Sequence, residues 1–227
     1  MNINHMTFLK WVGGKTQIME TLLEHIPDRI GTYYEPFLGG GSVCFQLLRS
    51  DRRIGRFRCF DANRDLINVY KQIQNSPDQL IGELKQLTTT FKKRSDSLKE
   101  SLYYSIRKIY NDRRSDPIKH AALFIFLNKT CFRGIYRTNR KGDYNVPYGH
   151  YKNPTIYDPI VIREYSSLFN DHDIRLNVVI SDHLPIIRSD QTILYILIRR
   201  IIRSIINHLR LIRIRDLIHR LIPICDV

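Results

Sequence analysis

Cysteine is scarce in this sequence, and its spacing excludes two of its common roles. No two cysteines form a Cys-x-x-Cys pair, the spacing typical of zinc sites and redox-active thiols; they are Cys44, Cys59, Cys131 and Cys225. We therefore expect neither a metal site nor a disulfide framework. Free thiols are usual in a reducing compartment, so the sequence predicts a cytoplasmic protein.

Long apolar runs are also missing. No stretch approaches the roughly 18 consecutive apolar residues that a bilayer span requires. Residues 1–7 are polar, unlike the start of a secretory signal. A Walker-type phosphate loop is incomplete, because the residue five positions before Gly14 is Leu9 rather than glycine. These absences argue against a membrane span, secretion and nucleoside triphosphate hydrolysis.

Acidic residues are few relative to basic ones. The 227 residues contain 36 Lys and Arg against 22 Asp and Glu, a net charge of +14, and 43% are hydrophobic. That hydrophobic fraction suffices for a packed core, and the length suits one α/β domain, alone or with a small insert. The charge favours a polyanionic partner, nucleic acid first; a basic surface without such a partner is the alternative.

The first 65 residues predict helices and strands around a glycine-rich turn. Hydrophobic spacing indicates a helix over 15–25 and strands over 33–37 and 56–60. Three glycines, Gly39 to Gly41, precede a helix over 42–48 for which Ser42 is the expected N-cap. Asp61 follows Gly39 by 22 residues, about the separation at which an acidic side chain meets ribose hydroxyls in dinucleotide folds. The alternative is a tight loop beside a solvated Asp61.

The middle of the chain has a different pattern. Apolar residues recur at helical spacing over 66–114, at Leu80, Leu84, Leu87, Leu98, Leu102 and Ile106. Residues 119–131 predict a buried helix, and a further strand is expected over 176–181. Residues 132–151 combine glycines, basic residues and alternating aromatics, which predicts a basic β-hairpin; Arg140 and Lys141 in it could be solvated or phosphate-facing charges only.

Five sequence blocks together are similar to the motifs of one enzyme family. They are KWVGGK at 10–15, YEPFLGGGSV at 34–43, DAN at 61–63, LNKTCF and GIYRTN within 127–139, and GDYNVPYG at 142–149. In this order they resemble the Dam-type (D12 class) DNA adenine-N6 methyltransferases over residues 7–182. One position departs from the family, which has Asn-Gly where this chain has Arg133-Gly134.

The resemblance implies S-adenosylmethionine as the cofactor. Position by position, it assigns cofactor contacts to Trp11, Lys15 and Asp61, with the ribose hydroxyls on Asp61. It places residues 35–41 in the cofactor loop, and the loop residues carried over are Glu35, Pro36, Phe37, Gly39 and Gly41. Trp11 taken alone could equally be a core residue, the commoner fate of a single tryptophan.

The same resemblance implies double-stranded DNA as the partner of a protein that we expect to be monomeric. Phe132 would stack against or wedge between bases, and Lys10 would reach a base from the other side. Base edges would be read by Ile135, Arg137, Asn139 and Pro147. Because an arginine fork on guanine is the commonest specific base contact, Arg137 suits a GATC-like site.

For the fold, the resemblance implies the α/β class. A Rossmann-like methyltransferase sheet would carry an inserted, mainly helical DNA-recognition domain with a β-hairpin. Residues 1–65 would bind S-adenosylmethionine, 66–154 would form the target-recognition domain, and 155–190 would return to the catalytic domain. We expect the sheet to be incomplete, because an aberrant tail over 191–227 replaces its later strands.

The family's catalytic motif, Asp-Pro-Pro-Tyr, does not occur in this sequence. In the family its carboxylate and a proline carbonyl accept from the adenine amine while the tyrosine stacks on the flipped base. Asp116-Pro117-Ile118 and Asp158-Pro159-Ile160 share only the first two residues of the motif. The sequence therefore offers no catalytic residues and predicts impaired catalysis.

The tail stands where the family's order places that motif. Of its 37 residues, 25 are Ile, Leu or Arg, with neither a helical nor a strand period. One set of allowed codons for 195–206, read two bases later, encodes Tyr-Phe-Asp-Pro-Pro-Tyr-Tyr. Our hypothesis is a frameshift between about 182 and 194. The alternative is a genuine basic amphipathic tail that contacts a membrane or a protein.

Three functions follow from these patterns. The first is a site-specific DNA adenine-N6 methyltransferase with impaired catalysis, and the second a catalytically dead, sequence-specific DNA-binding protein. The third is a basic peripheral membrane protein that uses its tail. Methyl incorporation into adenine separates the first two, whereas salt-sensitive DNA binding without incorporation favours the second.

Overall fold

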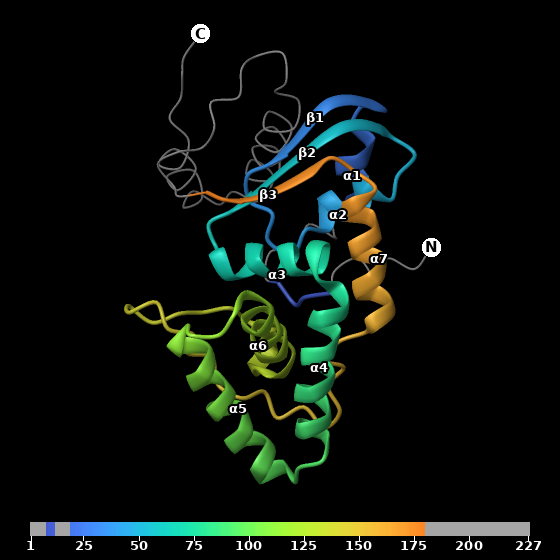
Figure 1. Cartoon of the computed structure of the whole chain (residues 1–227). Helices are drawn as coiled ribbons and strands as arrows, with labels where there is room; N and C mark the ends of the chain where they lie inside the picture. Colours follow the sequence, from blue (N-terminus) through green and yellow to red (C-terminus); the bar gives the residue numbers. More distant parts are fainter. Residues whose placement is uncertain (1–7, 12–18, 180–227) are drawn as a thin grey trace.

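The computed structural model describes residues 8–11 and 19–179. Three parallel strands, β1 (Arg29–Glu35), β2 (Arg53–Asp61) and β3 (Ile174–Val178), form a sheet in the order β1-β2-β3 (Figure 1). Arg29 pairs with Arg53, and Cys59 pairs with both Glu35 and Leu176. The three predicted strands therefore exist, but β1 and β2 begin earlier than the side-chain pattern predicts. β1 ends before Pro36, which has no N–H for a sheet ladder.

Helices pack on one face of the sheet. They are α2 (Ser42–Leu48), α3 (Arg64–Asn75) and α7 (Pro159–Asn170), and α1 (Met19–Glu24) precedes β1. The Cys59 thiol of β2 lies 3.5 Å from the Cys44 thiol of α2. The ring of Tyr165 in α7 meets that of Phe45 in α2 at 4.5 Å between centroids. These contacts give the sheet a core on its helix-bearing face.

The remaining helices lie on the side of α3 away from the sheet (Figure 1). They are α4 (Pro77–Lys92), α5 (Asp96–Asp112), α6 (Pro117–Thr130) and the short 3₁₀ turn η3 (Phe132–Gly134). Every residue of α6 from Ala121 to Asn128 is buried. A helix that is apolar on all sides belongs in the interior, and α6 packs against α3, α4 and α5. The helical pattern over 66–114 thus corresponds to three helices, although Leu98 is 51% exposed.

Both Asp-Pro-Ile sequences begin helices. The Asp116 carboxylate accepts hydrogen bonds from the N–H groups of Ile118 and Lys119, at 3.0 Å each. Asp158 accepts from the Ile160 N–H at 2.8 Å. In each case proline follows the capping aspartate, where its missing N–H costs nothing. These sequences therefore have a local structural role, as N-caps of α6 and α7.

The predicted hairpin is present as two antiparallel arms over 131–149. Isolated bridges join Cys131 to Tyr148 and Thr138 to Tyr144, without continuous strands between them. The Phe132 N–H donates to the Pro147 carbonyl at 2.9 Å. The expectation of a regular hairpin is therefore only partly met, because η3 and two positive-φ residues interrupt the first arm. We call residues 131–149 the hairpin segment.

Several sequence predictions fall outside the described residues. They are the first part of the helix over 15–25, Lys15, the end of the strand over 176–181 and the whole tail over 191–227. Within the part that is described, no helix combines the length and apolar character that crossing a bilayer demands.

Candidate functional site

The glycine turn lies at the C-terminal end of β1 and needs glycine at two positions. Gly39 and Gly41 have φ angles of 51° and 71°, in the left-handed region. A Cβ added to Gly41 would lie 2.5 Å from the ring of Phe45. Gly41, not Ser42, is the N-cap of α2, so the predicted N-cap is wrong. Ser42 is the first helical residue because the left-handed turn at Gly41 directs the chain into the helix.

Asp61 closes this turn from the next strand. One of its carboxylate oxygens accepts from the Gly39 N–H at 2.8 Å, and the other from the Asn63 N–H at 2.8 Å. The sequence spacing of 22 residues therefore corresponds to direct contact. Asn63 in turn caps α3 through its side-chain oxygen. The carboxylate and the glycine turn are one hydrogen-bonded unit at the C-terminal edge of the sheet.

The other predicted loop residues differ in exposure. Glu35 is buried, and its carboxylate accepts from the Tyr33 hydroxyl at 2.8 Å. Burial, reinforced by Glu35, raises the pKa of Tyr33. Pro36 is buried, whereas Phe37 is 53% exposed beside the loop. Phe37 therefore offers an accessible aromatic face next to Gly39, while Glu35 is part of the interior.

Trp11 lies between the glycine turn and the helices around α6. Its ring is stacked on Phe124 of α6 at 6.2 Å and on Tyr136 of the hairpin segment at 5.6 Å. A Cβ on Gly39 would lie 3.1 Å from the indole. Trp11 is only partly buried, so it is both packed and accessible. The structure thus brings Trp11, Gly39 and Asp61 together at one site.

An exposed aromatic–arginine pair follows α6. Phe132 is 45% exposed, and the Arg133 guanidinium lies 5.2 Å from the centre of its ring. Arg133 has φ 55°, a conformation that favours Gly or Asn. At Gly134, also at positive φ, a Cβ would lie 2.4 Å from the Lys10 side chain. We call the exposed Phe132–Arg133 pair the Phe132 tip. Lys10 is adjacent to this tip, and its ammonium lies 4.1 Å from the centre of the Tyr151 ring.

The remaining predicted DNA residues lie along the hairpin segment. The Arg137 Nε donates to the Asn145 side-chain oxygen at 2.8 Å, which orients an exposed guanidinium. Asn139 closes the turn: its side-chain oxygen accepts from the N–H groups of Lys141 and Asp143. Ile135 is half-buried and Pro147 is exposed. Arg137 is the residue of this set best placed to present several donors to a ligand.

A row of polar side chains on α5 supports the second arm of the hairpin segment. Tyr103 and Arg107 donate to the Val146 carbonyl at 2.8 and 3.0 Å. Asn111 both accepts from the Tyr144 N–H and donates to its carbonyl. The three α5 residues are spaced four apart and so occupy one helix face. Sequence analysis missed this row, although its spacing was visible.

A carboxylate-centred cluster joins α3 to α5 and α6. Asp65 accepts hydrogen bonds from the Tyr110 hydroxyl and from His120, whose Nε2 lies 3.2 Å away. The His120 ring stacks on Tyr110 at 4.5 Å. Burial by itself would raise the pKa of Asp65, but the hydrogen bonds from His120 and Tyr110 bring it below its ordinary value. The ionised carboxylate is therefore the form that the fold favours.

Lys129 lies near Lys10 in a partly dry environment. Burial, followed by repulsion from Lys10, lowers the pKa of Lys129 to about 8. An anion bound next to Lys129 would stabilise its charged form, because the negative charge offsets the cost of burying the ammonium. Two lysines near the Phe132 tip thus create a local positive field.

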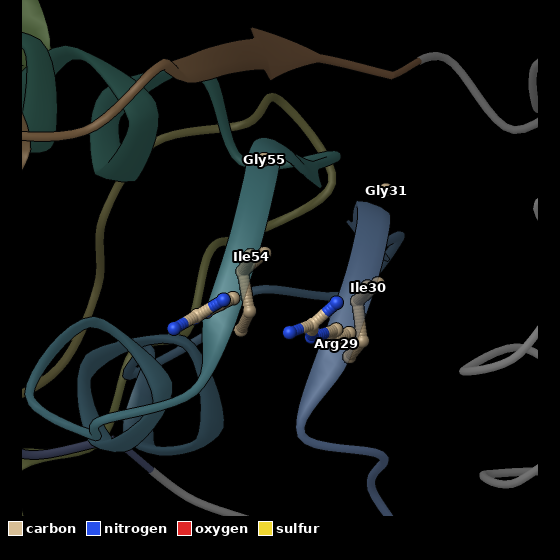
Figure 2. Close-up of a pocket in the computed structure, with 6 residues that line it drawn as sticks. Arg29, Ile30, Gly31, Ile54 and Gly55 are labelled. Atoms are coloured by element: carbon tan, nitrogen blue, oxygen red, sulfur yellow. The ribbon is translucent and has the colours of Figure 1, made fainter.

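A shallow hollow of about 450 Å³ lies elsewhere, at the N-terminal ends of the strands. Figure 2 shows Arg29, Ile30 and Gly31 of β1 beside Ile54 and Gly55 of β2. In parallel α/β sheets ligands bind at the carboxyl ends of strands. The hollow is at the opposite edge from Asp61, so it is separate from the glycine turn.

Sequence analysis also missed two buried residues that shape the site. The Tyr70 hydroxyl donates to the Gly39 carbonyl at 2.7 Å. The Asn128 side chain bonds the Lys10 backbone at both its N–H and its carbonyl. A polar residue inside the apolar run of α6 was the available signal for Asn128; no pattern distinguishes Tyr70.

Comparison with protein families gives one match over most of the chain. The family model for D12 class N6 adenine-specific DNA methyltransferases matches residues 11–196. Residues 197–227 lie outside this match. The matched range includes Trp11, the glycine turn, Asp61 and the hairpin segment.

Individual relatives are similar over the same part of the chain. The type II methyltransferase M.MjaIII of Methanocaldococcus jannaschii is 42% identical over 171 residues, 72% of this chain and 59% of the relative. M1.LlaDCHI of Lactococcus lactis is 34% identical over 177 residues, 77% of this chain and 58% of the relative. The DNA adenine methylase of Escherichia coli K12 is 34% identical over 147 residues, 65% and 49% respectively. The chain thus spans between half and three-fifths of the length of these curated relatives.

Proposed function

Because this chain belongs to the D12 class of N6 adenine-specific DNA methyltransferases, we propose that it binds S-adenosylmethionine at the glycine turn and a short duplex DNA site at the hairpin segment. We further propose that its catalysis is impaired. The observation that carries the cofactor proposal is the contact between Asp61 and the Gly39 N–H at 2.8 Å.

The residues around the turn suit this cofactor. Each Asp61 oxygen accepts one backbone N–H, which leaves a second lone pair on each for ribose hydroxyls. The Trp11 indole lies beside Gly39, and Phe37, two residues earlier in the chain, is 53% exposed, so both offer accessible aromatic surface near the turn; Lys15 would add a contact. When bound, S-adenosylmethionine supplies an electrophilic methyl group. The residues of this chain would hold and orient the cofactor.

The inserted residues between β2 and β3 would form the DNA-recognition domain. Phe132 at the exposed tip would stack on bases, with Lys10 reaching from the other side. Base edges would be read by Ile135, Arg137, Asn139 and Pro147. Arg137, oriented by Asn145, has the donor fork that suits guanine in a GATC-like site. Lys129, which lies near Lys10, would contact a phosphate, so binding should weaken with salt.

Impaired catalysis rests on the sequence after β3. The 227 residues contain no Asp-Pro-Pro-Tyr. Asp116 and Asp158, the two partial matches, cap helices. Without this motif, the chain has no carboxylate and carbonyl placed to accept hydrogen bonds from the two N–H groups of the flipped adenine, so methyl transfer should be impaired. The chain would then act as a catalytically dead, sequence-specific DNA-binding protein that retains its cofactor site.

Three measurements on one preparation test the proposal. Titration with S-adenosylmethionine should quench or shift the fluorescence of Trp11, the only tryptophan, and Asp61→Ala should weaken binding at least tenfold. A GATC duplex should bind in a salt-sensitive manner, and Arg137→Ala should reduce the preference for it over a scrambled duplex. Transfer of labelled methyl to adenine should be undetectable; transfer would refute impaired catalysis, and absence of cofactor binding would refute the cofactor site.

The frameshift hypothesis has its own test. Sequencing the coding DNA between codons 182 and 206 shows whether the shifted frame encodes Asp-Pro-Pro-Tyr. If it does, restoring that frame should restore methyl transfer. If the shifted frame does not encode Asp-Pro-Pro-Tyr, the frameshift hypothesis is wrong, and the tail is a genuine part of the protein.

A further inference from the structure

Residues 8–11 contact both halves of the molecule within four positions. The Phe8 ring meets Tyr70 of α3 at 5.9 Å and Tyr165 of α7 at 5.7 Å, on the sheet side. Three positions later, Trp11 stacks on Phe124 and Tyr136 on the other side. Lys10 and Trp11 are consecutive, yet one is assigned to DNA and the other to the cofactor. Whatever fixes this segment therefore acts on both proposed ligands.

Asn128, near the end of α6, makes the central polar contact to this segment. Its side-chain oxygen accepts from the Lys10 N–H at 2.9 Å, and its amide nitrogen donates to the Lys10 carbonyl at 2.7 Å. The amide nitrogen also lies 3.4 Å from the Gly134 carbonyl. Bonding both polar groups of one residue reproduces the pairing of an antiparallel strand neighbour. The Asn128 side chain thus pairs with the Lys10 backbone as a neighbouring strand would, and it also contacts the start of the hairpin segment at Gly134.

We propose that Asn128 is a positioning residue that fixes Lys10 and Trp11 together, so that one buried amide sets both the DNA contact and the cofactor contact. The proposal rests on the proposed function of those two residues. Asn128 is 3% exposed and so is not available to either ligand. Its effect on binding must therefore pass through the backbone that it holds.

The physical reason is the cost of unpaired backbone groups. Removal of the amide leaves the Lys10 N–H and carbonyl without these buried partners, and buried unpaired polar groups are unfavourable. Lys10 is itself exposed, so its freed N–H and carbonyl can bond to water instead, and the segment is then no longer tied to α6. Trp11 would then slide on Phe124 and Tyr136, and Lys10 would leave its place beside Gly134.

The experiment compares two isosteric changes on the same helix. Asn128→Leu removes the amide, and Thr130→Val removes a fully buried hydroxyl that donates only within the helix, to the Phe126 carbonyl at 2.7 Å. Both variants should unfold at a lower temperature than the wild type. Only Asn128→Leu should shift the Trp11 emission of the folded protein and weaken both S-adenosylmethionine and GATC duplex binding, each about tenfold. Thr130→Val should stay within twofold.

An Asn128→Leu variant that folds, with unchanged Trp11 emission and both affinities equal to those of Thr130→Val, would overturn the proposal. If Asn128→Leu does not fold, Asn128→Asp serves instead. It keeps an acceptor for the Lys10 N–H, and its ionised carboxylate loses the donor and places a negative charge against the Lys10 and Gly134 carbonyls. Unchanged Trp11 emission and unchanged affinities in this variant would also overturn the proposal. The emission shift needs no ligand. A wild type that binds neither ligand would therefore defeat the proposed function separately.

Discussion

The hydroxyl of Tyr70 donates a hydrogen bond to the Gly39 carbonyl oxygen at 2.7 Å. Asp61 accepts from the N–H of the same glycine, so both polar groups of Gly39 are held. Tyr70 lies in α3 and is fully buried, and this burial raises its pKa well above the ordinary value. The hydroxyl therefore keeps its proton and remains a donor across the physiological pH range.

Tyr70→Phe should loosen the glycine turn. Loss of one buried hydrogen bond should cost about 1 kcal/mol of unfolding free energy, and S-adenosylmethionine affinity should fall about fivefold, as titration would measure. The matched control is Tyr103→Phe, since the Tyr103 hydroxyl also donates to a backbone carbonyl, that of Val146 at 2.8 Å. The control should instead weaken duplex binding. Equal cofactor affinity in the two variants would contradict this assignment.

Gly41→Ala should destabilise the turn by about 2 kcal/mol or more. Its φ of 71° disfavours any side chain, and the added Cβ would collide with the Phe45 ring. Gly82→Ala is the control, because Gly82 lies inside α4 with open space around its Cβ position. That change should stabilise the protein by about 0.5–1 kcal/mol. Urea unfolding of the two variants should show a lower free energy of unfolding for Gly41→Ala and a higher one for Gly82→Ala.

Acid should unfold the protein partly through Asp65. The pKa of this carboxyl is lowered in the folded state, so its stabilising contribution is present above the unfolded value of about 3.9 and is lost as the pH falls through the folded value. Asp65→Asn should flatten the fall in unfolding free energy between about pH 5 and pH 3. Asp96→Asn, at an exposed carboxylate paired with Lys99, should change that slope little. Identical slopes in wild type and Asp65→Asn would rule out the cluster as the cause.

Lys129 should link DNA binding to pH. Its folded-state pKa of about 8 is below the unfolded value of about 10.4, so the unfolded chain binds more protons between these values and stability should rise with pH there. Duplex affinity should fall over the same range as the charge is lost. Lys129→Met should be more stable at pH 7, bind DNA more weakly and show a salt slope smaller by about one.

For Lys129, the decisive comparison is with Lys129→Arg. Arginine keeps its charge throughout this range, so its duplex affinity should stay constant between pH 7 and 9.5 at fixed salt. If the wild type is equally constant, Lys129 does not contact the DNA.

The sequence predicted the kinds of elements better than their limits. Apolar spacing identified the buried helix α6 and all three strands. The starts of β1 and β2 were missed because Arg29 and Arg53 pair with each other across the sheet, and neither side chain resembles a strand residue. Leu98 fits the helical period but is exposed. A helical period shows which side of the helix a residue lies on, but it does not show whether another part of the protein covers that side.

The sequence by itself determined the glycine turn and its aspartate. Positive φ is a local property of glycine, and the short β-α-β unit returns Asp61 to Gly39 without help from the rest of the chain. Only the tertiary structure decided the partners of Tyr70, Tyr103 and Asn128, which contact residues 31, 43 and 118 positions away. The periodicity of the sequence does not reveal which distant group a polar side chain will bond to, because that partner is determined by how the helices pack.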